Sequence, residues 1–231
     1  MKPTRPPQGA QAALRAVRLL KLFTNERPEM SLAEISRASG LNKTTTHRLL
    51  RALQSESLID RNPATSAYSL GAGLMALGVQ ALASSDLRRR VRPVLRTLAR
   101  ETGETATLEV PFEDSMLILD EVAGNHVIGA AGNIGTRWPI HATSTGKAWL
   151  AFDEAGIERL ASELKALTGS TLTDRDALKP QLAEIRRRGY AITVDEVEDG
   201  FTAVATIIRG VLGDVQGALS IGGPTQRLTS S

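Results

Sequence analysis

Residues 31–61, with the sequence SLAEISRASGLNKTTTHRLLRALQSESLIDR, decide the fold of the first part of this 231-residue chain. Ser31 and Glu34 have the spacing of a capping box, in which each side chain bonds the backbone at the start of a helix. Gly40 permits a tight turn between two helices. Asn42, a favoured N-cap residue, marks the start of the second helix. The stretch therefore predicts a helix–turn–helix.

The second predicted helix carries two opposite faces. Positions i, i+3, i+4 and i+7 form an inward stripe, made of Thr46, Leu49, Leu50 and Leu53. The opposite side carries hydrogen-bond donors and positive charge at Thr44, His47, Arg48 and Arg51. A helix that enters the major groove of DNA needs one face to pack and one face to contact the bases. The pattern therefore predicts DNA binding.

The candidate DNA contacts belong to this helix and to the segment that follows it: Lys43, Thr44, Thr45, His47, Arg48, Arg51 and Arg61. Arginine can bind guanine through O6 and N7, whereas lysine and threonine more often contact phosphate. Arg61 can enter the minor groove or hold a phosphate. The alternative is an ordinary solvated surface. The motif favours DNA contact at Arg48, Thr44 and Thr45 and leaves His47 and Arg51 open.

Charge is distributed unevenly along the chain. The net charge is +3 overall, but residues 1–70 carry +6 and residues 71–231 carry −3. A basic first part and a mildly acidic remainder fit one nucleic-acid module joined to a different domain. Cysteine is absent, which excludes disulfides and cysteine metal sites. Without an apolar run of 18 residues or a signal peptide, we expect no membrane contact and a cytoplasmic protein.

The other elements predict two domains. A helix from about Ala10, the helix–turn–helix, and two short wing strands at 58–60 and 68–70 make a winged helix over residues 1–70. An apolar helix over 71–85 is the expected linker. Residues 86–231 alternate between strands and helices and predict an α+β domain around one antiparallel sheet. Strands are expected at 105–110, 115–122, 126–132, 190–197, 202–209 and 215–222, and helices at 86–100, 144–152, 154–164 and 174–188.

Two local features are ambiguous at this level. Pro180 predicts a kink or a late start for the helix over 174–188. Four arginines, Arg88, Arg89, Arg90 and Arg92, can contact phosphate, but a solvated face or an acidic partner is the favoured interpretation.

Seven stretches together resemble the IclR family of bacterial transcriptional regulators, over about residues 10–228. They are ALRAVRLLKLF, SLAEISRASGLNKTTTHRLLRAL, YSLG, RPVLRTLARETGETATL, GTRWPIHATSTGKAWLA, IRRRGYAITVDEVEDG and ALSIGGP. The resemblance implies a winged helix, a linker helix and a GAF/profilin-like α+β effector domain. It also implies a homodimer or dimer of dimers on palindromic double-stranded operator DNA. The implied effector is a small organic acid or aromatic metabolite, and the regulator either represses or activates.

The resemblance also places an effector pocket at three points in the second domain. These are the turn entering the TSTGKA helix, the loop from Thr193 to Ala203, and the final strand. The candidate effector contacts are Ser144, Thr145, Gly146, Asp195, Glu196, Phe201, Ala203 and Ser220. A helix N-terminus offers unpaired N–H groups to a carboxylate. The alternatives are structural, namely capping for Ser144, a solvated loop for the acids, and strand packing for Ser220.

Two departures from the family pattern bear on the effector. Many members carry an acidic residue at the position of Thr193 and a cysteine at that of Ala203. The pocket should therefore be less polar, and Phe201, Trp138 and Trp149 are candidate apolar walls, although core packing also explains the tryptophans. The hypothesis is an effector with a larger apolar body than glyoxylate, such as an aromatic acid.

Catalytic and metal sites are not expected. HATSTGKA differs from a phosphate loop because His141 replaces its first glycine and Ala148 its Ser/Thr. His126 and His141 lack a second ligand at metal spacing. The chain shows no nucleophile–base pair, so no cofactor is expected. The rival interpretation is a metabolite-binding module or enzyme with an incidental basic first domain. Family members commonly continue into a final helix, so the chain ending at Ser231 is either naturally short or lacks that helix.

Overall fold

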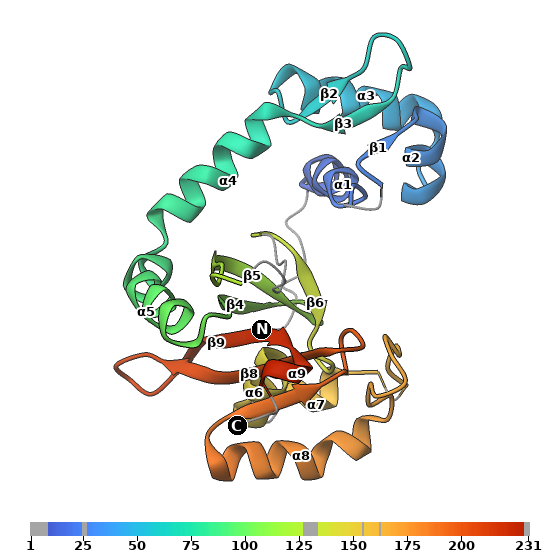
Figure 1. The fold of residues 1–231 in the computed structure, drawn as a ribbon. Helices are drawn as coiled ribbons and strands as arrows, with labels where there is room; N and C mark the ends of the chain where they lie inside the picture. The colour runs from blue at the N-terminus through green and yellow to red at the C-terminus, as the bar shows by residue number, and fades with distance from the viewer. Residues whose placement is uncertain (1–8, 25–26, 127–133, 154, 162, 229–231) are drawn as a thin grey trace. The chain divides into compact units, whose positions relative to one another are not determined.

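The computed structural model describes residues 9–24, 27–126, 134–153, 155–161 and 163–228 (Figure 1). They form two compact units that divide between Ser84 and Ser85. The elements of the first unit are α1 (Gln11–Leu20), β1 (Glu29–Met30), α2 (Leu32–Ser39), α3 (Lys43–Ser55), β2 (Ile59–Arg61), β3 (Tyr68–Leu70) and α4 (Ala72–Ser84).

The helix–turn–helix expected from residues 31–61 is confirmed. The Ser31 hydroxyl accepts the Glu34 N–H, and the Glu34 carboxylate accepts the Ser31 N–H at 2.8 Å, which completes the capping box. Gly40 ends α2 with a φ of 68°, a conformation that glycine adopts without strain. The Asn42 side chain accepts the Thr45 N–H at 2.8 Å and caps α3.

The inward face of α3 is also confirmed, because the buried residues of this helix are Thr46, Leu49, Leu50 and Leu53. The three leucines pack in a core with Leu19 of α1, Ile35 of α2 and Tyr68 of the wing. On α1 the core receives Leu19, which is fully buried, whereas Val17 is 51% exposed.

The wing consists of β2 and β3 paired antiparallel, with Asp60 opposite Ser69. β1, which the sequence did not predict, adds to the free edge of β3 and gives the strand order β1-β3-β2. The Asn62 side chain accepts the Ala64 N–H at 2.9 Å and fixes the turn between the wing strands. The wing strands therefore follow α3 along the chain and pair with each other in a fixed register.

Helix α4 is apolar on all sides and buries none of its residues. Its larger side chains are well exposed, with Met75 at 66%, Leu77 at 56% and Val79 at 65%. No helix in the described ranges is long and apolar enough to cross a membrane.

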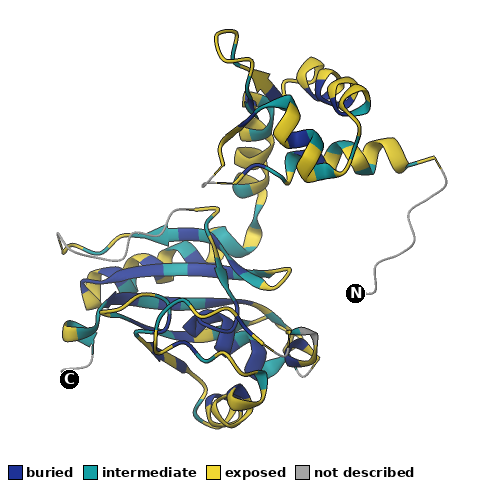
Figure 2. Cartoon of the chain, turned by 90° about the vertical axis from the view of Figure 1, so that its right-hand side faces the viewer, coloured by how far each residue is buried: buried dark blue, intermediate teal, exposed yellow. Residues whose placement is uncertain are grey.

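The second unit is built around one antiparallel sheet of six strands in the order β6-β5-β4-β9-β8-β7. Helices α6 and α8 pack on one face, and α5 packs on the other. Figure 2 shows that the buried residues are concentrated in the sheet and in the helix faces against it. Its elements are α5 (Asp86–Thr102), β4 (Thr105–Phe112), β5 (Ser115–Val122), β6 (Arg137–Pro139), α6 (Ser144–Phe152), α7 (Gly156–Arg159), α8 (Arg175–Arg188), β7 (Ala191–Val194), β8 (Phe201–Arg209), β9 (Val215–Pro224) and α9 (Thr225–Leu228).

Several local expectations differ from the structure. The helix expected over 154–164 is limited to the four residues of α7. Pro180 causes no late start, because α8 begins at Arg175 after the Asp174 cap and includes the proline. The strand expected at 126–132 lies, apart from His126, outside the described residues. β6 and the short α9 were not predicted.

The arginines at the start of α5 contact acidic partners within their own unit. Arg88 and Arg92 form ion pairs with Asp120 of β5, which is fully buried. Arg89 and Arg90 pair with Asp86 on the surface. The ion pairs of Arg88 and Arg92 with Asp120 therefore anchor α5 on the sheet.

Candidate functional site

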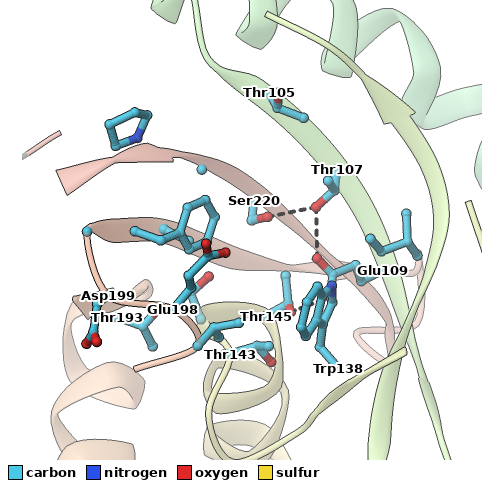
Figure 3. A pocket seen from close by; sticks show the side chains of 18 residues that line it. Thr105, Thr107, Glu109, Trp138, Thr143, Thr145, Thr193, Glu198, Asp199 and Ser220 are labelled. Carbon is cyan, nitrogen blue, oxygen red and sulfur yellow. Dashed lines mark hydrogen bonds between the residues drawn. The ribbon is translucent and has the colours of Figure 1, made fainter. Parts of the chain in front are cut away.

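A cavity of about 370 Å³ lies in the second unit, between the start of α6 and the sheet face that α6 and α8 cover (Figure 3). Its walls come from β4, β5, β6, β7, β8, β9, the start of α6 and the loop after β7. The lining residues are Thr105, Thr107, Glu109, Ile118, Trp138, Thr143, Ser144, Thr145, Thr193, Val197, Glu198, Asp199, Gly200, Phe201, Ala203, Ser220, Gly222 and Pro224.

The cavity exists because the central strands carry small side chains on this face. Strand neighbours alternate sides, so Ser220 and Gly222 of β9 share the face with Ala203 of β8. The backbone register pairs Ala203 with Gly222. A Cβ at Gly222 would lie 2.7 Å from the Phe201 ring, so the glycine makes room for that ring.

Four polar side chains form a continuous hydrogen-bonded chain along the wall. Ser220 and Thr107 are register partners on β9 and β4, and their hydroxyls lie 2.7 Å apart. Thr107 donates to Glu109 Oε1 at 2.9 Å, and Thr145 of α6 donates to Glu109 Oε2 at 2.7 Å. Figure 3 shows the two bonds made by Thr107. This series of hydrogen bonds joins β9 and β4 to α6.

Glu109 is the buried acid of this cavity, with 6% of its surface exposed. Burial raises the pKa of its carboxyl group, because charge is disfavoured away from water, and the two threonine hydroxyls oppose the shift only in part.

The start of α6 offers backbone donors to the cavity. Thr143 caps the helix, its hydroxyl accepting the Gly146 N–H at 3.0 Å. Within the described ranges, the N–H groups of Ser144 and Thr145 have no hydrogen-bond partner, as is usual for the first turn of a helix. A Cβ at Gly146 would lie 1.9 Å from the Ile140 carbonyl oxygen, so only glycine permits this close approach.

The structure brings some of the sequence-predicted effector residues to the cavity. Five of them line it, namely Ser144, Thr145, Phe201, Ala203 and Ser220, together with Trp138 and Thr193. Gly146, Asp195, Glu196 and Trp149 do not line it. Trp149 instead packs against the apolar core beneath α6.

The two acids outside the cavity hold the loop that closes it. Asp195, at a φ of 58°, accepts the Gly200 N–H at 3.0 Å and the Thr225 hydroxyl at 2.7 Å. Glu196 forms a buried ion pair with Lys147 of α6. The Lys147 ammonium also donates to the Gln181 side chain of α8 at 2.8 Å.

Sequence reasoning missed the β4 wall of the cavity, Thr105, Thr107 and Glu109. The available signal was the alternation in TATLE, where Ala106 and Leu108 face α5 and the polar residues face the opposite side. Three polar side chains on one buried strand face require partners or a ligand.

The predicted DNA-contact residues lie together on the first unit. Lys43, Thr44, His47, Arg48 and Arg51 are exposed along α3, and Thr45 is half-buried. Arg61 is exposed on β2, with its guanidinium carbon 5.7 Å from the centre of the Tyr68 ring. The recognition helix and the adjacent wing thus present one set of donors and positive charges.

Comparison with known families agrees with both units. The model of the IclR helix-turn-helix domain matches residues 12–63, and that of the bacterial transcriptional regulator IclR C-terminal domain matches residues 79–231. The chain belongs to the IclR family. It is 34% identical to the HTH-type transcriptional regulator XynR of Escherichia coli over 221 residues, covering 94% of this chain and 88% of that protein.

Solved IclR-family structures share the fold. A putative IclR regulator from Silicibacter sp. TM1040 has a TM-score of 0.85 at 30% identity, covering 95% of this chain and 87% of that chain. An IclR homologue from Microbacterium hydrocarbonoxydans, complexed with 4-hydroxybenzoate, has a TM-score of 0.78 at 28% identity, covering 93% and 90%. The chain is thus an IclR-family transcriptional regulator with a DNA-binding and an effector domain.

No group of three or more His, Asp or Glu side chains that could hold a metal ion occurs in the described part of the chain.

Proposed function

We propose that this regulator binds operator DNA through α3 and the wing, and that a small organic acid or aromatic metabolite in the cavity alters its DNA affinity. The observation that carries the proposal is the cavity itself, where the N–H groups of Ser144 and Thr145 adjoin a wall of hydroxyl groups. Partially charged helix N-termini favour anionic groups. The same cavity has apolar surfaces for the body of a ligand.

The size and walls of the cavity favour an aromatic acid over a two- or three-carbon acid. About 370 Å³ is within the range of small-molecule sites. Trp138 and Phe201 supply aromatic surface, and Ala203 adds little polarity. The related structure from Microbacterium hydrocarbonoxydans contains an aromatic acid, 4-hydroxybenzoate. We propose that Ser144, Thr145, Phe201, Ala203 and Ser220 contact the effector.

We further propose that the regulator acts in the cytoplasm as a homodimer, or as a dimer of dimers, on a palindromic operator. The exposed apolar surface of α4 supports dimerisation, because a helix that is apolar all round is stable in water only when it is covered. A two-fold dimer places two recognition helices on two half-sites. The effector acts only if it binds the DNA-competent and DNA-incompetent states with different affinities.

Selection of bound sites from random double-stranded DNA tests the first half of this proposal. The expected product is a palindromic consensus whose binding weakens steeply with salt, because phosphate contacts release counterions. Unselective binding would favour the rival interpretation, a metabolite-binding protein with an incidental basic domain. A thermal-shift screen of small acids tests the second half, and stabilisation only by two- or three-carbon acids would contradict an aromatic effector.

A further inference from the structure

Glu109 occupies an unusual electrostatic position in the cavity. Among the described residues, the cavity lining includes three acids, Glu109, Glu198 and Asp199, and no lysine, arginine or histidine. Glu198 and Asp199 are exposed on the loop, where water screens them, whereas Glu109 is buried. A buried carboxyl without a cation is costly when ionised. Packing alone therefore does not account for a glutamate at this position.

In the described part of the chain, the elements around Glu109 present uncharged groups to it. Its register partners are Ile118 on β5 and Ala218 on β9. From α6 it receives only the Thr145 hydroxyl, since the buried ammonium of Lys147 is bonded to Glu196 and Gln181. Within the described residues, no cation therefore balances a negative charge at this position.

The regular alternation of β4 aims Glu109 at the cavity, on the same face as Thr105 and Thr107. The pairing of β4 with β5 shifts register between Leu108 and Glu109. The extra residue of this irregularity lies on β5, and β-bulges are frequent beside functional sites. Each carboxyl oxygen of Glu109 accepts one threonine hydroxyl, which leaves acceptor capacity for a donor from a ligand. The Glu109 carboxyl group is thus held in place by two hydrogen bonds, but its capacity to accept hydrogen bonds is not fully used.

We infer that Glu109 is the specificity-determining residue of the cavity, which recognises a hydroxyl or amino group of the effector and excludes a second ionised acid group. The inference rests on the proposed effector site and narrows its ligand class. The preferred effector carries at most one carboxylate, for the N-terminus of α6, and a hydrogen-bond donor for Glu109. Dianions are disfavoured because they place a like charge beside a buried acid.

Two sets of matched probes test this inference, each on one carbon skeleton. The first set is benzoate, 4-hydroxybenzoate and terephthalate. The second is propionate, 3-hydroxypropionate and malonate. Binding to the full chain is measured by ligand-observed NMR, which detects weak binding. In at least one set, the hydroxy acid is expected to bind most tightly and the dicarboxylate most weakly.

The variant Glu109→Gln keeps the shape of the side chain and removes its charge. It should improve dicarboxylate binding relative to the hydroxy acid by at least about tenfold, since the like-charge penalty is lost. The matched control is Glu184→Gln on the exposed face of α8, which should leave the ratio unchanged. In the wild type, the affinity for terephthalate, which stays largely doubly ionised over this range, should also rise as the pH falls from about 8 to 5.5, because Glu109 takes up a proton. This second measurement holds even if the variant fails to fold.

The outcomes separate the inference from the proposed function. If dicarboxylates bind the wild type as well as the hydroxy acids do, without a pH effect, the role of Glu109 is overturned while the cavity remains an effector site. If no probe of either set binds the wild type or the variant, both the role of Glu109 and the proposed acid or aromatic effector are overturned.

Discussion

The Lys147 ammonium lies 2.6 Å from Glu196 Oε2, and both side chains are buried. Lys147 belongs to α6, whose first turn lines the cavity, and Glu196 belongs to the loop that closes it. The same loop is held by the Thr171 hydroxyl, which donates to the Glu196 carbonyl at 2.6 Å. The ion pair therefore joins α6 to this loop, the two parts of the cavity wall that are not strands of the sheet.

Replacing one member of this pair should destabilise the second unit strongly. Lys147→Met leaves Glu196 buried without its cation, a situation that costs about 3–5 kcal/mol in comparable sites. Both tryptophans of the chain, Trp138 and Trp149, lie in this unit, so urea unfolding followed by tryptophan fluorescence measures the loss.

The control for this prediction is Lys179→Met, which breaks an exposed pair with Asp176 and should change the unfolding midpoint very little. The double variant K147M/E196L should recover most of the lost stability, because it removes both buried charges. Equal midpoints for Lys147→Met and Lys179→Met would contradict the prediction.

Gly146→Ala should also destabilise the second unit, for a steric reason. The added methyl group would meet the Ile140 carbonyl oxygen at 1.9 Å, so either α6 or the preceding turn must move. Overpacking of this kind costs about 1–3 kcal/mol. The control is Gly169→Ala, where a Cβ meets no atom within 4 Å. The same fluorescence assay compares them, and equal stability of the two variants would show that the close approach is unimportant.

Local rules predicted the DNA-binding half of the fold well. The capping pair of Ser31 and Glu34 and the spacing of Leu49, Leu50 and Leu53 act within one or two helical turns, so the chain itself records them. The added strand β1 was missed because two residues carry no periodicity, and its pairing with β3 depends on tertiary contact.

The cavity was less predictable because it depends on register between distant strands. Thr107 and Ser220 are 113 residues apart, and only the pairing of β4 with β9 brings their hydroxyls together. Likewise, no local pattern distinguishes Glu196, which pairs with a buried lysine, from the exposed Glu198 that lines the cavity. The family resemblance located the region, but the geometry decided which side chains reach the cavity.

Glu109→Gln should alter the pH dependence of stability in a defined direction. Burial raises the pKa of the folded Glu109 carboxyl above its usual value of 4.5. The folded protein therefore holds this proton more tightly than the unfolded chain does. Its contribution to stability is complete below about pH 4.5 and is lost as the pH rises through the raised pKa.

Glu109→Gln does not lose stability in this way, because glutamine does not titrate. The free energy of unfolding of the variant, relative to that of the wild type, should therefore increase between about pH 5 and pH 8. Urea unfolding at several pH values measures the difference, and Glu184→Gln again serves as the control. A pH-independent difference would show that Glu109 titrates normally in the folded protein.

Arg48→Ala should weaken operator binding without affecting folding. Arg48 is exposed on α3 and lies on the face opposite the buried stripe, so its removal deletes no core contact. Loss of one arginine contact to a base or phosphate reduces affinity by roughly fivefold or more. Gel-shift titration on the selected operator measures this effect. Arg187→Ala on α8 is the control, and unchanged affinity in the Arg48 variant would remove this residue from the DNA interface.

Charges on α4 should dissociate the proposed dimer. Met75 and Val79 are four residues apart, so they share one face of α4, and both are well exposed. The double variant M75E/V79E places two carboxylates on that face, where burial against a second copy would cost several kcal/mol. Sedimentation velocity should show a monomer for the variant at concentrations where the wild type is a dimer.

A second double variant, V211E/L212E, provides the control for this experiment. Val211 and Leu212 are almost fully exposed at the tip of the β8–β9 hairpin. Their replacement adds the same charge as M75E/V79E, but to an apolar pair outside α4. The control should leave the oligomeric state unchanged. If it dissociates the dimer while M75E/V79E does not, the hairpin rather than α4 forms the contact between subunits. Because each operator half-site needs its own recognition helix, the monomeric variant should also bind a single half-site and the full palindrome with nearly equal affinity.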